Sequence, residues 1–211
     1  MRYRLAVFDF DGTLADSFAF FLDTLDTLAD EHGFRKLDRS QLDILRTLDA
    51  RAVLKHVGLP LWKAPRVGAH YKRLMAAQAH RIPLFDGTDG MLRQLAAQGA
   101  ALAILSSNSE ENVRTVLGPE LGGLFAHYEC GSTLFGKRDK LRRLLRAAGV
   151  PRGQVLCIGD EVRDLEAAHQ ENLDFGAVAW GYTRPDALAA HGPAFLFSQP
   201  MEICAALADP K

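Results

Sequence analysis

Short apolar runs alternate with helical patterns along most of the chain, and this alternation constrains the fold more than any other feature. Runs of this kind predict strands that are buried on both faces of a sheet. Four are clear and a fifth is shorter: 5–8, 101–105, 154–158, 175–180 and 194–197. Because strands that alternate with helices form parallel sheets, we expect an α/β fold with a doubly wound, Rossmann-like core.

Two of the intervening segments carry clear helix signals. In 139–148 the leucines recur at helical spacing, which places Lys140 on the polar side, and Gly149 is a stop signal. Ser109 begins another helix as its N-cap, and Gly118 followed by proline is expected to end it.

Residues 17–82 break the alternation, because their pattern is helical and contains no clear strand. We therefore predict a small α-helical cap over 17–82, inserted into a core made of 1–16 and 83–211. The charge of this segment is lopsided. Residues 17–50 contain four basic and seven acidic residues, whereas 51–82 contain seven basic residues and no acid.

Composition excludes several classes of protein. With 211 residues, of which 48% are hydrophobic, the chain can bury a sizeable core, and a disordered chain is excluded. A net charge of -1 gives no sign of a nucleic-acid or membrane partner, and no run approaches the ~20 apolar residues of a membrane span. Three widely spaced cysteines favour a reduced, cytoplasmic protein without a zinc site or disulfides. The oligomeric state, monomer or homodimer, stays open.

The first chemical motif lies where the first predicted strand ends. Asp9 and Asp11 are two residues apart, so they point to the same side of an extended chain, and Gly12 follows them. Two close carboxylates raise each other's pKa unless a cation lies between them, and oxygen ligands suit Mg²⁺. For either residue alone, capping of a turn is the alternative.

Further polar groups follow the other predicted strands. Ser106 precedes a helix N-terminus, where a hydroxyl can hold an anion such as phosphate, although ordinary turn chemistry also explains it. Lys137 lies in a loop just before the helical segment 139–148. Asp160 follows a buried strand, and Asp164 lies one helical turn further on. Since all these groups fall at carboxyl ends of strands, they predict a site for Mg²⁺ and phosphate.

The chain resembles the haloacid dehalogenase-like (HAD) phosphohydrolase superfamily over nearly its whole length. The resemblance rests on four motifs in order: Asp9-x-Asp11-Gly-Thr13, Ser106, Lys137 and Gly159-Asp160-x-x-x-Asp164. Within that superfamily the chain looks most like the phosphoglycolate phosphatase branch, to which Ala179-Trp180-Gly181-Tyr182 is also similar. The inserted helices resemble the small cap that family members carry after the first strand.

The resemblance implies a phosphoryl transfer in two steps. Asp9 would attack phosphorus and form an aspartyl-phosphate, while Asp11 would act first as acid and then as base. Mg²⁺ would be held by Asp9, the backbone carbonyl of Asp11, and Asp160.

The remaining motif residues would serve the phosphoryl group. Ser106, helped by the backbone of Ser107, would bind its oxygens, and Lys137 would neutralise them. Asp164 would orient Lys137 or a water molecule beside the metal.

Several activities are compatible with these motifs. The leading hypothesis is an Mg²⁺-dependent phosphomonoesterase that acts on a small phosphorylated metabolite. A phosphomutase, which returns the phosphoryl group to its substrate, is a close alternative. A carbon–halogen hydrolase needs neither Asp11 nor a metal, and a non-catalytic phosphate-binding or regulatory protein would be expected to lose a motif residue. Asn108 and the Lys137-Arg-Asp-Lys segment depart from the branch pattern, so the substrate stays open.

The acid-free segment generates a prediction about specificity. We expect Arg51, Lys55 or Arg66 to contact the non-phosphoryl end of the substrate, although a solvated face is the alternative for each. Charge reversal at each position should then raise KM for an anionic substrate more than for p-nitrophenyl phosphate. Equal changes for both substrates would contradict the prediction.

Overall fold

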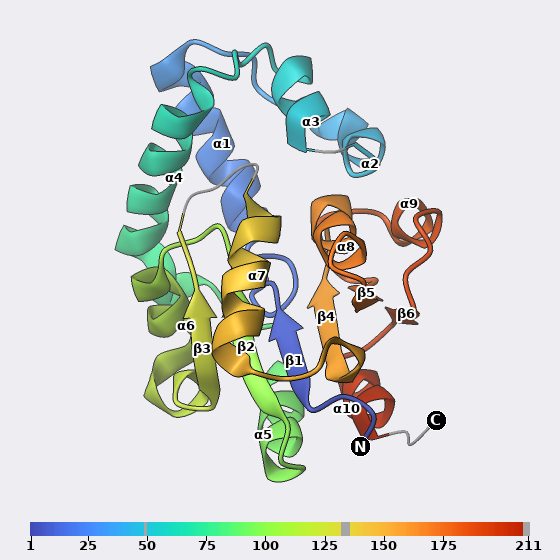
Figure 1. The fold of residues 1–211 in the computed structure, drawn as a ribbon. Helices are drawn as coiled ribbons and strands as arrows, with labels where there is room; N and C mark the ends of the chain where they lie inside the picture. Colours follow the sequence, from blue (N-terminus) through green and yellow to red (C-terminus); the bar gives the residue numbers. More distant parts are fainter. Residues whose placement is uncertain (49, 132–135, 209–211) are drawn as a thin grey trace.

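The computed structural model describes residues 1–48, 50–131 and 136–208, and its centre is a six-stranded sheet whose strands are all parallel (Figure 1). Its order is β3-β2-β1-β4-β5-β6. The strands are β1 (Leu5–Phe8), β2 (Ala101–Leu105), β3 (Phe125–Glu129), β4 (Val155–Gly159), β5 (Asp174–Val178) and β6 (Phe195–Phe197). Strand order reverses at β1, which pairs with β2 on one side and β4 on the other, so the carboxyl end of β1 lies at the switch point of the sheet.

Side chains of β1 alternate between two hydrophobic clusters. Leu5 and Val7 pack into the cluster on one face of the sheet, whereas Ala6 and Phe8 pack into the cluster on the other. Burial of both faces explains why this strand reads as a continuous apolar run.

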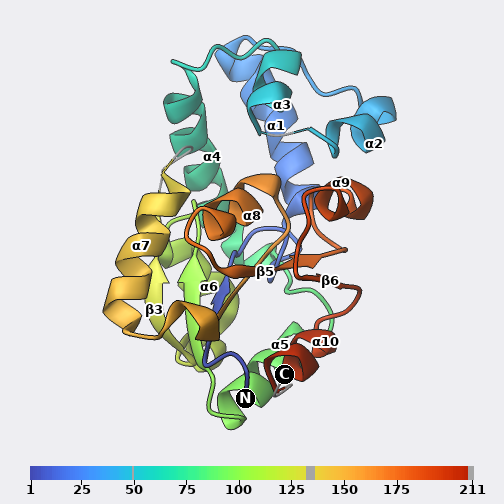
Figure 2. The same cartoon turned by 45° about the vertical axis from the view of Figure 1, so that its right-hand side comes forward.

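Helices cover both faces of the sheet (Figures 1 and 2). One cluster contains buried side chains from α5 (Thr88–Ala97), α6 (Glu110–Gly122) and α10 (Met201–Ala208). The other contains side chains from α7 (Lys137–Ala148), α8 (Val162–His169) and α9 (Pro185–Ala189). A short 3₁₀ turn, η3 (Arg152–Gln154), leads into β4. The predicted doubly wound α/β fold is confirmed.

Five of the six strands follow the sequence prediction to within two residues at each end. The prediction missed β3, which forms an edge of the sheet and is mostly half-buried. Its residues, Phe-Ala-His-Tyr-Glu, therefore lack the apolar run that marks the central strands.

Two helix predictions need correction. α7 begins at Lys137, so this lysine is the first residue of the helix and not part of a preceding loop. Lys140 is buried and not on a solvated face, because its Nζ donates to the carbonyls of Gly131 and Ser106. In α6 the backbone leaves the helical conformation at Gly118, as predicted, but a further turn continues to Gly122.

The inserted segment is helical and lies beyond the carboxyl ends of the strands (Figure 1). It contains α1 (Phe18–His32), η1 (Arg39–Gln41), α2 (Leu42–Leu45), α3 (Ala50–His56), α4 (Ala64–Gln78) and η2 (Ala79–Arg81). A hydrophobic cluster of its own includes Leu28 and Val57, and His32 of α1 hydrogen-bonds to His70 of α4. The boundaries 17–82 for this cap stay a prediction.

Cys130, Cys157 and Cys204 are free thiols. Within the described residues, no helix combines the length and the apolar character that crossing a membrane requires.

A buried carboxylate fixes the position of α7, which carries Lys137. Glu171, just after α8, accepts hydrogen bonds from Arg138 and Arg142 of α7 and from Arg152 of η3. Burial raises the pKa of Glu171, but the three guanidinium groups outweigh that effect and lower the pKa to about 2.

Replacement of Glu171 tests how much these hydrogen bonds stabilise the fold. Glu171→Gln should lower the free energy of unfolding by about 1 to 2 kcal/mol, less than for a fully buried pair because the arginines are half exposed. Since the pKa is lower in the folded state, the contribution is present above pH 4.5 and is lost as the pH falls toward 2. Urea unfolding at several pH values measures it. Glu120→Gln, which breaks an exposed pair with Arg93, is the control and should have little effect.

Candidate active site

The motif residues meet at the carboxyl edge of the sheet. Asp9 directly follows β1, Ser106 follows β2, and Asp160 follows β4, while Lys137 opens α7. These three strands are neighbours around the switch point, so residues far apart in the sequence lie within one site.

Lys137 lies between two buried carboxylates. Its Nζ is 2.5 Å from Asp9 Oδ1 and 2.5 Å from Asp164 Oδ1. Burial raises the pKa of Asp9 to about 7, although Lys137 acts in the opposite direction. Burial lowers the pKa of Lys137, but Asp164 and Asp9 outweigh it, so the pKa lies above its ordinary value and the ammonium stays charged.

Asp160 is fully buried and oriented by two donors. The Thr13 hydroxyl donates to Oδ1 at 2.8 Å, and the Tyr182 backbone N–H donates to Oδ2 at 2.7 Å. Burial, with the nearby carboxylates of Glu161 and Asp9, raises the pKa of Asp160 well above its ordinary value. A cation beside this carboxylate would therefore be strongly favoured.

Close approach to Asp160 requires glycine at two positions. Gly12 has φ +81°, and a Cβ there would collide with the Asp160 carboxylate and lie 2.7 Å from Tyr182 Cδ1. A Cβ on Gly181 would collide with Asp160 as well. Gly12 thus serves both the left-handed turn after Asp11 and the packing of Asp160.

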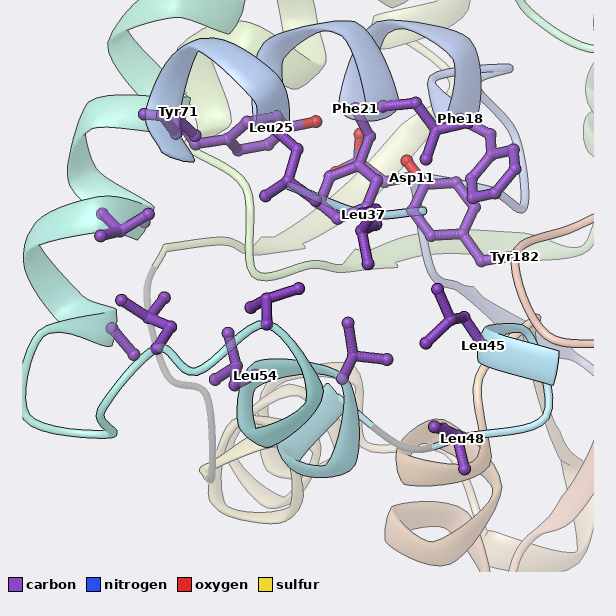
Figure 3. A pocket seen from close by; sticks show the side chains of 18 of the residues that line it. Asp11, Phe18, Phe21, Leu25, Leu37, Leu45, Leu48, Leu54, Tyr71 and Tyr182 are labelled. Carbon is purple, nitrogen blue, oxygen red and sulfur yellow. The ribbon is translucent and has the colours of Figure 1, made fainter. Parts of the chain in front are cut away.

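Asp11 has different surroundings from Asp9. Its carboxylate accepts hydrogen bonds from the Ser17 hydroxyl at 2.9 Å and from Asn108 Nδ2 at 3.0 Å. Burial raises its pKa, while these two hydrogen bonds lower it. Asp11 also lines a cavity under the helical segment, with Tyr182 close by (Figure 3). Sequence reasoning missed the roles of Ser17 and Asn108, because nothing in their spacing links them to Asp11.

Two hydrogen bonds hold the segment after β2 in place. Ser106 Oγ accepts the Asn108 backbone N–H at 3.0 Å, and the Ser106 carbonyl accepts Lys140 Nζ at 3.2 Å. Ser107 lines the same cavity as Asp11. The hydroxyl and backbone N–H groups of this turn could therefore hold phosphoryl oxygens next to Asp9.

The basic residues predicted to contact substrate lie elsewhere. Arg51, Lys55 and Arg66 are exposed, and none of them lines the cavity beside Asp11. The structure therefore does not bring them together with the motif residues.

The acidic cluster fits a divalent cation. Carboxylate oxygens of Asp9, Asp160 and Asp164 lie within 4.8 Å of one another, and all three residues are buried. Hard oxygen ligands of this type are those that Mg²⁺ prefers. Buried carboxylates with raised pKa values, as at Asp9 and Asp160, are the surroundings that a bound cation would stabilise.

Fold and site together define an α/β protein with an acidic centre at the switch point of its sheet. The chain belongs to the haloacid dehalogenase-like hydrolase family, whose model matches residues 6–178.

Named relatives agree with that assignment. The chain is 32% identical over 202 residues to the phosphoglycolate phosphatase of Synechococcus elongatus, covering 95% of each chain. It is 31% identical over 201 residues to that of Xanthomonas campestris, covering 88% of each. The crystal structure of a putative phosphoglycolate phosphatase from Lactobacillus plantarum superposes with a TM-score of 0.83 at 23% identity, covering 97% and 99% of the two chains. The chain is a phosphatase of this family, a hydrolase of phosphoric monoesters.

Gly12→Ala tests the close packing against Asp160. We expect the Cβ to displace that carboxylate and to lower phosphatase activity about 10- to 100-fold, the loss typical of mutations beside a metal ligand, which is the role that the acidic cluster predicts for Asp160. Gly87→Ala is a matched control, because Gly87 has φ +82° but open space around it. It should show the backbone strain as a lower Tm while it keeps its activity. Equal activity losses in the two variants would contradict the role of Gly12.

Proposed function

We propose that the protein is an Mg²⁺-dependent phosphomonoesterase that hydrolyses a small phosphorylated metabolite through an aspartyl-phosphate on Asp9. The observation that carries the proposal is the difference between two carboxylates only two residues apart. Asp9 lies in the acidic cluster beside Lys137, whereas Asp11 lies outside that cluster and lines the cavity. Different surroundings suit different chemical roles.

In the first step, an Asp9 carboxylate oxygen attacks phosphorus while the bond from phosphorus to the alcohol oxygen breaks. Asp11 gives its proton to that oxygen, and burial, which raises the pKa of Asp11, favours the protonated form more than solvent would. Ser17 and Asn108 fix the direction of this carboxyl group.

In the second step, Asp11 takes a proton from water as the water oxygen attacks the phosphorus of the aspartyl-phosphate. The bond between Asp9 and phosphorus breaks and inorganic phosphate forms. Ser106, Ser107 and Lys137 would hold the phosphoryl oxygens through both steps.

Asp9, Asp160 and the backbone carbonyl of Asp11 would hold Mg²⁺, with Asp164 orienting Lys137 at their side. The cation, when bound, shields negative charge so that a carboxylate can approach an anionic phosphate. The free thiols of the three cysteines support a reducing, cytoplasmic location for this reaction.

Asp9→Asn tests the proposed nucleophile. Phosphate release from a panel of phosphomonoesters should be Mg²⁺-dependent in the wild type and fall to background in this variant. Asp86→Asn, at an exposed aspartate, is the control and should retain activity. Chelation followed by return of Mg²⁺ should remove and restore turnover.

A trapped intermediate separates the hydrolase from a mutase. Acid quenching of wild-type protein during turnover should leave a phosphoryl group on the peptide that contains Asp9. Phosphorylation of Asp9 without release of inorganic phosphate would favour the mutase and overturn the hydrolytic step. Undiminished turnover by Asp9→Asn would overturn the nucleophile.

A further inference from the structure

A cavity of about 320 Å³ lies between the helical segment and the strand ends (Figure 3). It begins at Asp11 and Tyr182 and extends among side chains of α1, α3 and α4. Figure 3 shows Phe21, Leu25 and Leu54 turned toward this space. Asp11 is the proposed acid, and it lies on the wall of this cavity. The alcohol that accepts its proton would therefore lie in this cavity.

The wall away from Asp11 is apolar. Its lining includes Leu22, Leu25, Leu37, Leu54, Val57 and Val67. The charged side chains among the lining residues in the described part of the chain are Asp11, Arg46, Lys72, Glu161 and Arg163.

Two of the cations among these residues are engaged in contacts at the core side of the cavity. Arg46 donates to the carbonyls of Gly181 and Tyr182, and Arg163 donates to Glu161. Lys72 of α4 interacts electrostatically with Asp11, so the charges gather around the proposed phosphoryl site, and the deeper space offers hydrocarbon surface.

Resting on the proposed function, we infer that this cavity binds the alcohol part of the substrate, and that the substrate is a phosphomonoester of an apolar alcohol. Apolar cavities of about 150 Å³ accept one benzene ring, so a cavity about twice as large suits two fused rings or a chain of roughly eight to ten carbons.

The size of the cavity and its apolar lining do not suit a short alcohol that carries a carboxylate. The glycolate part of phosphoglycolate has two carbons and a carboxylate, so it would leave most of the space unfilled. A longer acidic alcohol would have to turn its carboxylate toward Leu54 and Val57, where that carboxylate would lose its hydration without a partner.

A series of n-alkyl phosphates tests the inference in the wild-type protein with Mg²⁺. Each added methylene should raise kcat/KM about threefold to fourfold until the cavity is filled, near eight to ten carbons. Phosphoglycolate should be a poorer substrate than octyl phosphate. Values of kcat/KM that stay level or fall with chain length would overturn the inference.

Gly68 of α4 is a position at which a larger side chain would enter the cavity. It lines the cavity, and a Cβ there would meet no atom within 4 Å. Gly68→Leu should lower kcat/KM for octyl phosphate at least about tenfold more than kcat/KM for ethyl phosphate, the equivalent of two lost methylenes. Gly90→Leu, at an open helical glycine in α5, is the matched control and should change neither substrate. An equal response of both esters to Gly68→Leu would overturn the inference.

A binding experiment separates this inference from the hydrolytic function. Octylphosphonate, which has no ester bond to break, should raise the Tm of the wild type and of Gly90→Leu but not of Gly68→Leu. Stabilisation by octylphosphonate without hydrolysis of any ester would support the cavity and refute the phosphomonoesterase. Hydrolysis at the same rate for all chain lengths, without stabilisation, would keep the phosphomonoesterase and overturn the apolar substrate.

Discussion

The placement of Lys137 between Asp9 and Asp164 is the interaction on which the rest of the site depends. A parallel sheet brings the ends of its central strands together, and here it brings carboxylates together in a buried place. Buried like charges are unfavourable, and one ammonium at 2.5 Å from each of two of them offsets part of that cost. The remaining excess of negative charge would favour a bound cation. The anchoring of α7 through Glu171 is therefore part of the catalytic arrangement as well as of the fold.

The helical segment adds an apolar environment next to this charged one. Under the proposed function, acidic groups and hydrogen-bond donors would surround the phosphoryl group, and aliphatic side chains would surround the alcohol. Asp11 lies at the boundary between the two, held on one side by Ser17 and on the other by Asn108. A group that exchanges protons with a departing alcohol benefits from such a boundary, because its surroundings keep its pKa above that of a solvated carboxylate.

Most of the core could be predicted from the sequence because burial on both faces leaves a continuous apolar run, as in β1. Edge strand β3 could not, since half-buried positions tolerate polar residues. The motif residues at strand ends were predictable from topology, as Asp9 and Asp160 illustrate. Their supporting contacts were not. Asn108 reaches Asp11 across 97 positions of sequence, and Lys140 is buried although the helical pattern places it on the polar side of α7.

Arg46 joins the helical segment to the loop that also serves Asp160. Its guanidinium bonds to the carbonyls of Gly181 and Tyr182, and the N–H of Tyr182 bonds to the Asp160 carboxylate. Under the proposed function, this short loop would border the substrate cavity through Tyr182 and orient a ligand of the cation through the backbone of the same residue. A substitution that shifts the backbone of this loop should therefore change substrate binding and cation affinity together, so the two properties would be coupled in variants of this protein.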